Sequence, residues 1–553
     1  MKMKRFISFA AAVCLALGFA GCANKEKEEP VKKVELNAPG EFPIAKEKTK
    51  ITIGVQQNAS IKDWETNALT RELEEKANVD LEFVVFPSAD ASSKLAAMVA
   101  SQTELPDIIA METVDLTTYY DTGIAVCLTD YYNNPDIAYY FNKRLEDNPE
   151  EREYILNAAK SPDGKHYGVL RYTPEIGNEY PYRMWINKTW LDKLGLKVPT
   201  TTDEYYKVLK AFAQKDPNGN GKKDEIGLIG SINGWNQKPQ DTIMNAFTYA
   251  NPGRYYLTSK NGKLDVAYNK PEYKKGLEFL NKLVKEGLLS PQTFTQDVVQ
   301  LKSILENPEI QQVGSIAAGS MSVFTPDSER KKDFVAMAPL TGPDGVCYSP
   351  YSQTLPNCNT IITKYCDNPE LAFRMLDYLY EEKMSVWQRF GEPGVDWDTK
   401  VEGIRGLYED SLGIKCGFRQ IKNIAGSTTQ NSFLGNILPA YRPIMSEFSM
   451  QGIARNENPY DYTVFTADAV PLYMDKHPEE IAPWILYTPE ETEEINDIRA
   501  SLETYRSESV VRFITGDKPF SEWDSYTKEL EKIGLSEYLK VSQKAYDRMK
   551  SAK

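Results

Sequence analysis

The sequence predicts an α/β protein built of two lobes, with additional helices at its C-terminal end. The folded part opens with strand, helix, strand, helix and strand over residues 51–110, which is typical of parallel βαβ units. Strand-like segments return after residue 330, and the last hundred residues are largely helical. A chain of 553 residues is too long for one simple core, so we expect the chain to cross between the lobes more than once.

The first elements follow from apolar spacing. Leu69, Leu73 and Ala77 recur at helical spacing, and Leu95, Met98 and Val99 share one face of a second helix. Apolar runs between and around these helices predict strands. We therefore expect strands at 51–55, 79–86 and 105–110, and helices at 64–77 and 91–101.

The later elements show start and stop residues as well as spacing. Thr202 is the expected N-cap of a helix, Gly287 ends another, and Thr488-Pro489-Glu490-Glu491 is a capping box with proline at the first helical position. We expect strands at 167–170, 183–187, 226–229, 313–318 and 334–339, and helices at 188–194, 203–215, 271–286, from 368 and behind Thr488.

The N-terminal segment predicts export and a lipid anchor. Lys2, Lys4 and Arg5 precede an uncharged, mostly apolar run of residues 6–21, which is too short for a membrane span. Phe19-Ala20-Gly21-Cys22 looks like a bacterial lipobox, which implies removal of the signal peptide 1–21 and lipidation of Cys22 by acyl chains such as palmitate. The alternative is an ordinary signal peptide with a chance cysteine. Residues 22–49 then form a flexible tether rich in Lys, Glu and Pro.

Composition excludes several functions. Cleavage of the signal peptide takes the net charge from −14 to −17, because Lys2, Lys4 and Arg5 leave, and this acidity argues against nucleic acid and against direct adhesion to anionic lipid. With two histidines and no CxxC motif, a Cys/His zinc site is improbable. Five cysteines follow Cys22, an odd number that leaves a thiol or an intermolecular pair. The aromatic content of 11% is compatible with sugar binding.

The strongest local motif is an oxygen-rich loop that follows a predicted helix. Counting Asp216 as position 1, oxygen-bearing side chains fall at positions 1, 3, 5 and 9, and Gly221 at position 6 allows the sharp turn of an EF-hand loop. Gly227 at position 12 lacks the usual carboxylate, and Glu225 is its natural substitute. We predict a structural calcium ion, since carboxylates this close repel each other without a cation. The alternative is a turn without metal.

Short motifs in a fixed order link the chain to a known family. They are Leu95-Ala-Ala-Met-Val-Ala-Ser101, Leu105-Pro-Asp-Ile-Ile109, Trp185-Ile-Asn-Lys-Thr-Trp-Leu-Asp-Lys-Leu-Gly-Leu196, Pro199-Thr-Thr-Thr-Asp-Glu204, the Asp216 loop, Pro339-Leu-Thr-Gly-Pro-Asp-Gly345, Asn368-Pro-Glu-Leu-Ala372, Phe513-Ile-Thr-Gly516 and Ala545-Tyr-Asp-Arg548. The chain resembles the extracellular solute-binding proteins of ABC importers for carbohydrates, in the large lipoprotein branch that includes alginate-oligosaccharide-binding proteins.

The resemblance implies a periplasmic-binding-protein-like fold, in which two lobes joined by a hinge close on an oligosaccharide and hand it to a membrane permease. It implies calcium ligands at Asp216, Asn218, Asn220, Lys222, Asp224 and Glu225. We expect lobe 1 at about residues 50–165 and 330–400, and lobe 2 at about 166–329 and 401–553. We further expect an exported monomer without enzymatic activity, tied to the cell membrane by its lipid.

Candidate sugar contacts follow from loop position and chemistry. Ligands of open parallel sheets sit beyond the carboxyl ends of the strands. Candidates for stacking on sugar rings are Trp64, Tyr172, Trp235 and Trp397, and candidates for bonding hydroxyls are Gln57, Asn58, Glu112, Arg171 and Asn233. The family's cleft loop departs from its usual form at Gly391-Glu392-Pro393-Gly394, where the glutamate is shifted by one residue.

Three other functions remain open. An exported glycoside hydrolase needs two carboxylates around a scissile bond, and no motif singles out such a pair. The calcium loop suggests a glycan-binding or dockerin-like module, although dockerins carry two such loops. A binding protein for a peptide-like solute would share the fold.

Overall fold

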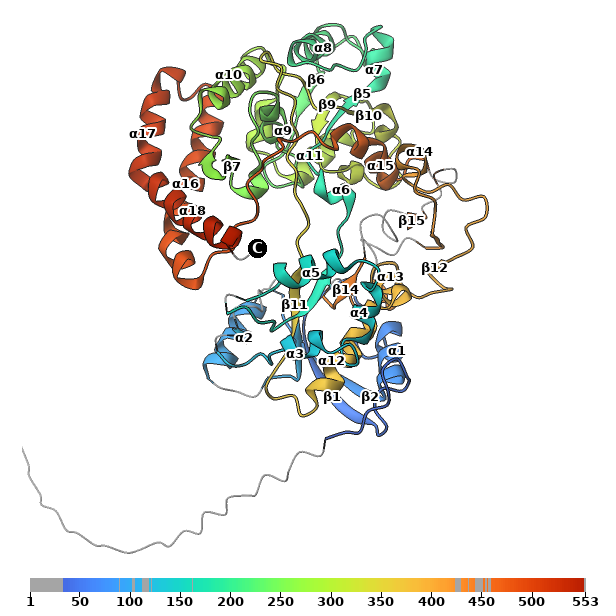
Figure 1. Ribbon diagram of the computed structural model, residues 1–553. Coiled ribbons are helices and arrows are strands. Elements are labelled where there is room, and N and C mark those ends of the chain that lie inside the picture. Colours follow the sequence, from blue (N-terminus) through green and yellow to red (C-terminus); the bar gives the residue numbers. More distant parts are fainter. Residues whose placement is uncertain are drawn as a thin grey trace, which may run out of the picture.

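The computed structural model describes residues 33–551, except residues 89, 102–104, 112–118, 121, 162, 423–428, 436, 443–450, 453–454 and 456–458. These residues form two lobes, which lie one above the other in Figure 1 and confirm the predicted two-lobed α/β architecture. The signal peptide, Cys22 and Glu112 lie outside the described residues. Within the described part of the chain, no helix is both long enough and apolar enough to span a membrane.

Lobe 1 is built on a mixed sheet, which in the described residues has six strands in the order β14-β4-β11-β3-β1-β2. β1 is parallel to β2 and β3, and β11 is antiparallel to β3 and β4. The strands are β1 Thr49–Gln56, β2 Val79–Phe86, β3 Ile108–Ala110, β4 Val169–Tyr172, β11 Asn357–Ile362 and β14 Ala440–Tyr441. The helices are α1 Ala68–Ala77, α2 Ala91–Ala100, α3 Thr129–Asn133, α4 Tyr139–Arg144, α5 Pro149–Ala158, α12 Pro369–Asp377 and α13 Glu382–Phe390.

The opening βαβ unit forms for local reasons. Ile51, Ile53 and Val55 of β1 are buried in the lobe 1 core. The side chain of Asn67 accepts a hydrogen bond from the amide of Leu69 at the start of α1, and Asn78 ends the helix in a left-handed conformation. This places α1 against β2 and returns the chain parallel to β1.

Lobe 2 has a second sheet, in which four strands of the described chain follow the order β10-β5-β9-β6. These strands are β5 Met184–Asn187, β6 Ile226–Ile229, β9 Val313–Ala317 and β10 Phe334–Met337, and the hairpin β7 Leu257–Lys260 with β8 Lys263–Val266 lies beside them. The helices are α7 Lys188–Lys193, α8 Thr202–Gln214, α9 Pro239–Ile243, α10 Pro271–Lys285, α11 Val298–Leu305, α15 Tyr462–Tyr473, α16 Pro489–Thr515, α17 Trp523–Ile533 and α18 Leu535–Ser551. The N-cap of α8 is Thr201, one residue before the expected Thr202, because its side chain accepts the hydrogen bond from the amide of Glu204.

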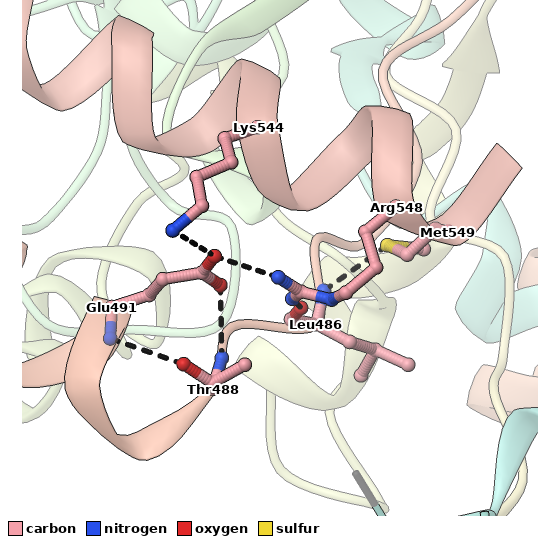
Figure 2. A network of polar contacts seen from close by, with 6 residues as sticks. All are labelled: Leu486, Thr488, Glu491, Lys544, Arg548 and Met549. Atoms are coloured by element: carbon pink, nitrogen blue, oxygen red, sulfur yellow. Dashed lines mark hydrogen bonds and ion pairs between the residues drawn. The ribbon is translucent and has the colours of Figure 1, made fainter. Parts of the chain in front are cut away.

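The C-terminal helices are fixed by a polar network at the start of α16 (Figure 2). The predicted capping box is confirmed: the amide of Glu491 donates to Thr488 Oγ1 at 3.2 Å, and the amide of Thr488 donates to Glu491 Oε2 at 3.0 Å. Arg548 and Lys544 of α18 pair with the buried Glu491 carboxylate at 2.6 and 3.4 Å. The last turns of α18 are thereby held against the first turn of α16.

The chain passes between the lobes along several segments. Residues 173–183, which include α6 Ile176–Glu179, connect β4 to β5, and residues 338–356 connect β10 to β11. A further segment, 391–461, leaves lobe 1, contacts α15 through α14 Glu409–Leu412, returns at β14 and leads on to α15. It also carries β12 Trp397–Asp398, β13 Phe418–Gln420 and β15 Gln451–Gly452.

These pairings move the expected lobe boundaries. β4 belongs to the lobe 1 sheet, although residues from 166 were expected in lobe 2, because β4 pairs with β11 and β14. β10 belongs to lobe 2, although residues from 330 were expected in lobe 1, because it pairs with β5. β14 returns residues 440–441 to lobe 1. Sequence spacing reveals the strands but not their partners.

The expected tether is partly folded onto lobe 1. Ile44 and Ala45 are buried in the lobe 1 core, and their amides donate to the carbonyl oxygens of Lys76 and Ala77. Arg374 Nη2 donates to the carbonyl oxygens of Asn37 and Ala38 at 2.9 and 3.1 Å. We call residues 34–46 the N-terminal strap. The folded part of the chain therefore begins well before residue 50.

Candidate functional site

The facing edges of the two sheets follow from the topology. β4 ends at Tyr172, where the chain leaves for lobe 2, so the carboxyl ends of the parallel strands β1 and β3 also lie at that edge. β5 enters lobe 2 at Met184, and β9 is antiparallel to β5 and parallel to β6, so the carboxyl ends of β6 and β9 face back. Ligands of such sheets bind beyond these ends.

Trp235 is the most prominent side chain at the lobe 2 edge. It lies in the loop after β6, and 47% of its surface is exposed. Its ring lies directly on Gly319 after β9, where a Cβ atom would stand 2.5 Å from Cδ2 and Cε3 of the ring. The amide of Gly319 donates to the carbonyl oxygen of Trp235 at 2.9 Å. The backbone supports the ring from one side and leaves the remaining surface accessible.

The support beneath Trp235 is tied to the connection between the lobes. The buried guanidinium of Arg183, at the end of the first connection, donates to the carbonyl oxygens of Gly319 and Gly177. Asn236, next to Trp235, donates through Nδ2 to the carbonyl oxygen of Pro181 at 3.2 Å. The position of the Trp235 ring therefore depends on residues of the first connection.

The other predicted contacts, at the lobe 2 edge and the facing lobe 1 edge, differ in availability. Asn233 is exposed, but its Oδ1 accepts a hydrogen bond from the amide of Val298 at 2.9 Å, so its oxygen serves the start of α11. Gln57 is exposed after β1, whereas Asn58 Oδ1 accepts from the amide and hydroxyl of Ser60. Tyr172 is half-buried and meets Tyr154 edge to face, with ring centroids 5.9 Å apart. Gln57, Tyr172 and Trp235 remain available.

Two other predicted contacts, Trp397 and Arg171, are buried, and a third, Trp64, is half-buried. Trp397 is buried with Val386, Phe390 and Phe418, and its Nε1 donates to the carbonyl oxygen of Gly391 at 2.6 Å, so its faces are not open to a sugar. Both ring faces are covered because the phenylalanines come from segments that are not next to Trp397 in the sequence.

Arg171 and Trp64 also serve the lobe 1 fold. Arg171 is buried in β4 and donates through Nη1 to the carbonyl oxygen of Leu438 at 3.0 Å, which fixes the chain leading to β14. Trp64 is half-buried and packs on Phe83 of β2 with ring centroids 5.6 Å apart. The position of a residue in a predicted loop therefore does not reveal whether its side chain is exposed or packed into the fold.

Sequence reasoning missed the residues that join the two connections. The buried carboxylate of Glu179 accepts from the amide of Thr354 at 2.9 Å and from Tyr351 Oη at 3.3 Å, and its carbonyl oxygen accepts from the amide of Ser352. Burial raises the pKa of Glu179 above its usual range. Tyr351 packs between Tyr180 and His477, at 5.2 and 4.9 Å between ring centroids. No local sequence pattern marks this arrangement, because Glu179 and Tyr351 lie 172 residues apart in the chain.

The Asp216 loop adopts a tight turn. Asp216, Gly219 and Gly221 have positive φ values of 45°, 80° and 75°, and the Asp216 carboxylate accepts from the amides of Gly219, Asn220 and Gly221. Asn218 and Asn220 donate through Nδ2 to Asp224 at 2.9 Å, and these bonds lower the pKa of the Asp224 carboxyl. The loop therefore gathers the predicted side chains around Asp224.

Glu225 is the member of this loop whose carboxylate is incompletely hydrogen-bonded. Its Oε1 is buried without a hydrogen-bond partner among the described residues, and burial, with the charge of Asp216, raises the pKa of its carboxyl. No group of three or more His, Cys, Asp or Glu side chains in the described chain is arranged to hold a metal. The donor set of carboxylates, amides and the Lys222 carbonyl nevertheless suits a hard cation, and the orphaned Glu225 oxygen lacks such a partner.

Two lobes, strand ends that face each other and an exposed tryptophan between them define a solute-binding protein. Residues 58–385 match the bacterial extracellular solute-binding proteins, and the chain belongs to this family. Membership confirms the broader class predicted from the motifs, an extracellular solute-binding protein.

Individual relatives agree over long alignments. The chain is 26% identical over 577 residues to the fructooligosaccharide ABC transporter substrate-binding protein FusA of Streptococcus pneumoniae, covering 100% of both chains. Its fold is similar to the structure of a FusA EF-hand mutant in complex with fructo-nystose, with a TM-score of 0.71, 23% identity and coverage of 91% and 100%. It is also similar to an HMO-binding solute-binding protein from Bifidobacterium longum infantis, with a TM-score of 0.73, 20% identity and coverage of 90% and 99%.

Proposed function

We propose that this chain captures an oligosaccharide between its lobes and that Trp235 stacks on one of the sugar rings. The single observation that carries the proposal is the Trp235 ring, exposed at the edge facing lobe 1 and supported from below by Gly319. Aromatic faces combined with a few polar groups are typical of small-molecule sites. Gln57 and Tyr172 at the opposite edge would supply hydrogen bonds from lobe 1.

Fructooligosaccharides are the first ligands to test, because FusA aligns with the whole chain and is named for them. Acidic oligosaccharides have less support. A cationic site would favour such sugars, but Arg171 is buried against the carbonyl oxygen of Leu438.

We also propose that the Asp216 loop binds a structural calcium ion. Asp216, Asn218, Asn220, Asp224 and Glu225 with the carbonyl oxygen of Lys222 would hold it. Burial and, secondly, the charge of Asp216 raise the pKa of Glu225, and a cation would offset both effects. The FusA structure named as an EF-hand mutant gives this loop type a precedent in a relative.

The remaining parts of the proposal concern location and partners. Lipidation at Cys22 would hold the chain on the outer face of the cell membrane, where it would deliver sugar to permease subunits. We assign no catalytic step to the chain, because the relatives are binding proteins.

Isothermal titration calorimetry on the full chain tests the proposal, with fructooligosaccharides of increasing length, acidic oligosaccharides and peptides as separate arms. We expect saturable binding of an oligosaccharide without release of reducing ends. Trp235→Ala should weaken it at least about fivefold, and Leu472→Ala, at an exposed position of α15, serves as the control. Binding of peptides alone would overturn the substrate class, and release of reducing ends would favour a hydrolase.

A further inference from the structure

One buried carboxylate joins two of the chain segments that run between the lobes. Glu179 ends α6 in the first connection, at the side of lobe 2 that faces lobe 1 (Figure 1), and the residue is 6% exposed. Its two carboxylate oxygens accept hydrogen bonds from the amide of Thr354 at 2.9 Å and from Tyr351 Oη at 3.3 Å. Both donors belong to the second connection, 175 and 172 residues further along the chain.

These hydrogen bonds occupy the carboxylate and leave it unavailable to a sugar. Both oxygens of Glu179 already have a donor, and little of the residue is exposed. Burial raises the pKa of this carboxyl, and among the described residues the hydrogen bonds from Thr354 and Tyr351, rather than a neighbouring cation, oppose that shift. A carboxylate buried without a cation is costly unless hydrogen bonds offset the cost. The contacts of Glu179 therefore indicate a role in holding the second connection, not in contacting the solute.

On the lobe 2 side, both connections are attached to the lobe. The amide of Tyr351 donates to Tyr249 Oη at 3.2 Å, and its carbonyl oxygen accepts from Asn251 Nδ2 at 2.7 Å. In the first connection, α6 contacts α15 of lobe 2. Residues 176–183 of the first connection and 338–351 of the second therefore move with lobe 2.

On the lobe 1 side, each connection enters the sheet beside a buried proline. Pro174 follows β4 after one intervening residue, and Pro356 directly precedes β11, which pairs with β4. Proline fixes its own φ and restricts the residue before it. Within these two connections, movement of one lobe relative to the other is therefore concentrated in residues 173–175 and 352–356. Thr354, whose amide is held by Glu179, lies within the second of these segments.

We propose that Glu179 is a positioning residue for lobe closure: its carboxylate fixes the second connection to the first, so that the two bend together when a solute is bound. The inference rests on the proposed binding function. Without this carboxylate, Thr354 would be released from α6, and the ligand-free lobes would adopt a wider range of orientations. Closing on a sugar would then cost more conformational entropy, so affinity would fall although no sugar contact is lost.

Distances between the lobes of the ligand-free full chain test the proposal without a sugar. Donor and acceptor dyes are attached through unnatural amino acids that replace Glu75 of α1 and Lys532 of α17, whose side chains are 76% and 72% exposed. Single-molecule energy transfer then gives the distribution of distances between the lobes. Glu179→Ala should broaden this distribution. Glu179→Gln keeps an acceptor for the Thr354 amide and a polar partner for Tyr351 Oη, so it should restore the wild-type width. A wild-type width in Glu179→Ala would overturn the proposal.

Affinity measurements separate positioning from a general loss of stability. In calorimetry, Glu179→Ala should weaken fructooligosaccharide binding about three- to tenfold. The loss should be no larger, because the bond from the Ser352 amide to the Glu179 carbonyl oxygen remains. Asp377→Asn changes another buried carboxylate, in the lobe 1 core and outside both connections, and as the control it should leave the affinity unchanged. Equal weakening by Asp377→Asn, or by Glu179→Gln and Glu179→Ala, would overturn the proposal.

A milder variant keeps the test decisive if Glu179→Ala does not fold. Tyr351→Phe retains the ring between Tyr180 and His477 and removes one of the two hydrogen bonds to the Glu179 carboxylate. It should broaden the distance distribution and weaken binding, each by less than Glu179→Ala. Wild-type values in both measurements would then refute the role of the carboxylate. If the wild type binds no oligosaccharide, the proposed function fails, while the distance distribution still decides whether Glu179 holds the connections together.

Discussion

Replacing Gly319 with alanine tests whether the Trp235 ring depends on the backbone beneath it. The added Cβ would lie 2.5 Å from Cδ2 and Cε3 and 2.9 Å from Cε2 of the ring. Nonbonded carbon atoms prefer about 3.5–4.0 Å. The ring must therefore move away from position 319 by about 1 Å or more, although Trp235 itself is unchanged.

The displacement should act mainly on binding. Stacking on an aromatic side chain contributes about 1–3 kcal/mol, by analogy with nucleic-acid bases. Losing it would weaken fructooligosaccharide binding roughly five- to 150-fold. Overpacking typically costs about 1–3 kcal/mol of unfolding free energy. We expect the lower end for Gly319→Ala, because Trp235 is 47% exposed and can move outward.

A double-mutant cycle identifies the cause. Affinity is measured by calorimetry, and unfolding free energy by urea denaturation, for Gly319→Ala, Trp235→Ala and the double variant. In the Trp235→Ala background, Gly319→Ala should change neither quantity by more than about 0.5 kcal/mol, because no ring remains to be displaced. An equal loss of affinity in both backgrounds would refute the reasoning, as would wild-type affinity in the single Gly319→Ala variant.

Three further predictions concern calcium, a buried carboxyl and the C-terminal network. Removing calcium with a chelator should lower Tm in calorimetry, and Glu225→Gln should reduce that difference; equal Tm values with and without calcium would exclude a stabilising ion. Burial raises the pKa of Asp377 from 3.8 to about 7, so between these pH values the folded protein holds a proton that the unfolded chain releases. The free energy of unfolding should therefore fall as pH rises from about 4 to 7, by at most about 4 kcal/mol. Asp377→Asn should flatten that dependence in urea titrations at several pH values, and an unchanged slope would contradict it. Arg548→Ala should cost about 1–2 kcal/mol by leaving Lys544 as the one remaining cation beside the buried Glu491 carboxylate, and Arg548→Lys should recover part of the loss; a change below about 0.5 kcal/mol would show that the network contributes little.

The sequence predicted features that depend on neighbouring residues. The strand at 79–86 and the capping box at Thr488 occur where expected, because apolar spacing and capping chemistry act within a few residues. The Asp216 loop folds as a tight turn because its glycines tolerate positive φ. Interactions among neighbouring residues are enough to form these elements, so the sequence alone predicts them.

The support beneath Trp235 and the lobe boundaries depend on residues that are far apart in the sequence. Trp235 and Trp397 have the same chemistry, yet one lies on a glycine of another strand end and the other is covered by Phe390 and Phe418. Nothing within a few residues of either tryptophan distinguishes them. Loop position and aromatic chemistry predicted Trp235 as a sugar contact, and the rule that ligands sit beyond strand ends, applied to the strand at 313–318, points to Gly319 as well.

The N-terminal strap limits how the importer can be arranged if Cys22 carries lipid. The strap begins at Val34, so only residues 23–33 can span the distance from the anchor, which is at most about 40 Å for a fully extended chain. Such a tether keeps lobe 1 close to the membrane and raises the effective concentration of binding protein at the permease. Deleting residues 26–31 should therefore reduce uptake of labelled fructooligosaccharide while leaving its affinity in solution unchanged. Replacing the same residues with a Gly/Ser segment of equal length is the control and should restore uptake. Unchanged uptake by the deletion variant would show that reach does not limit delivery.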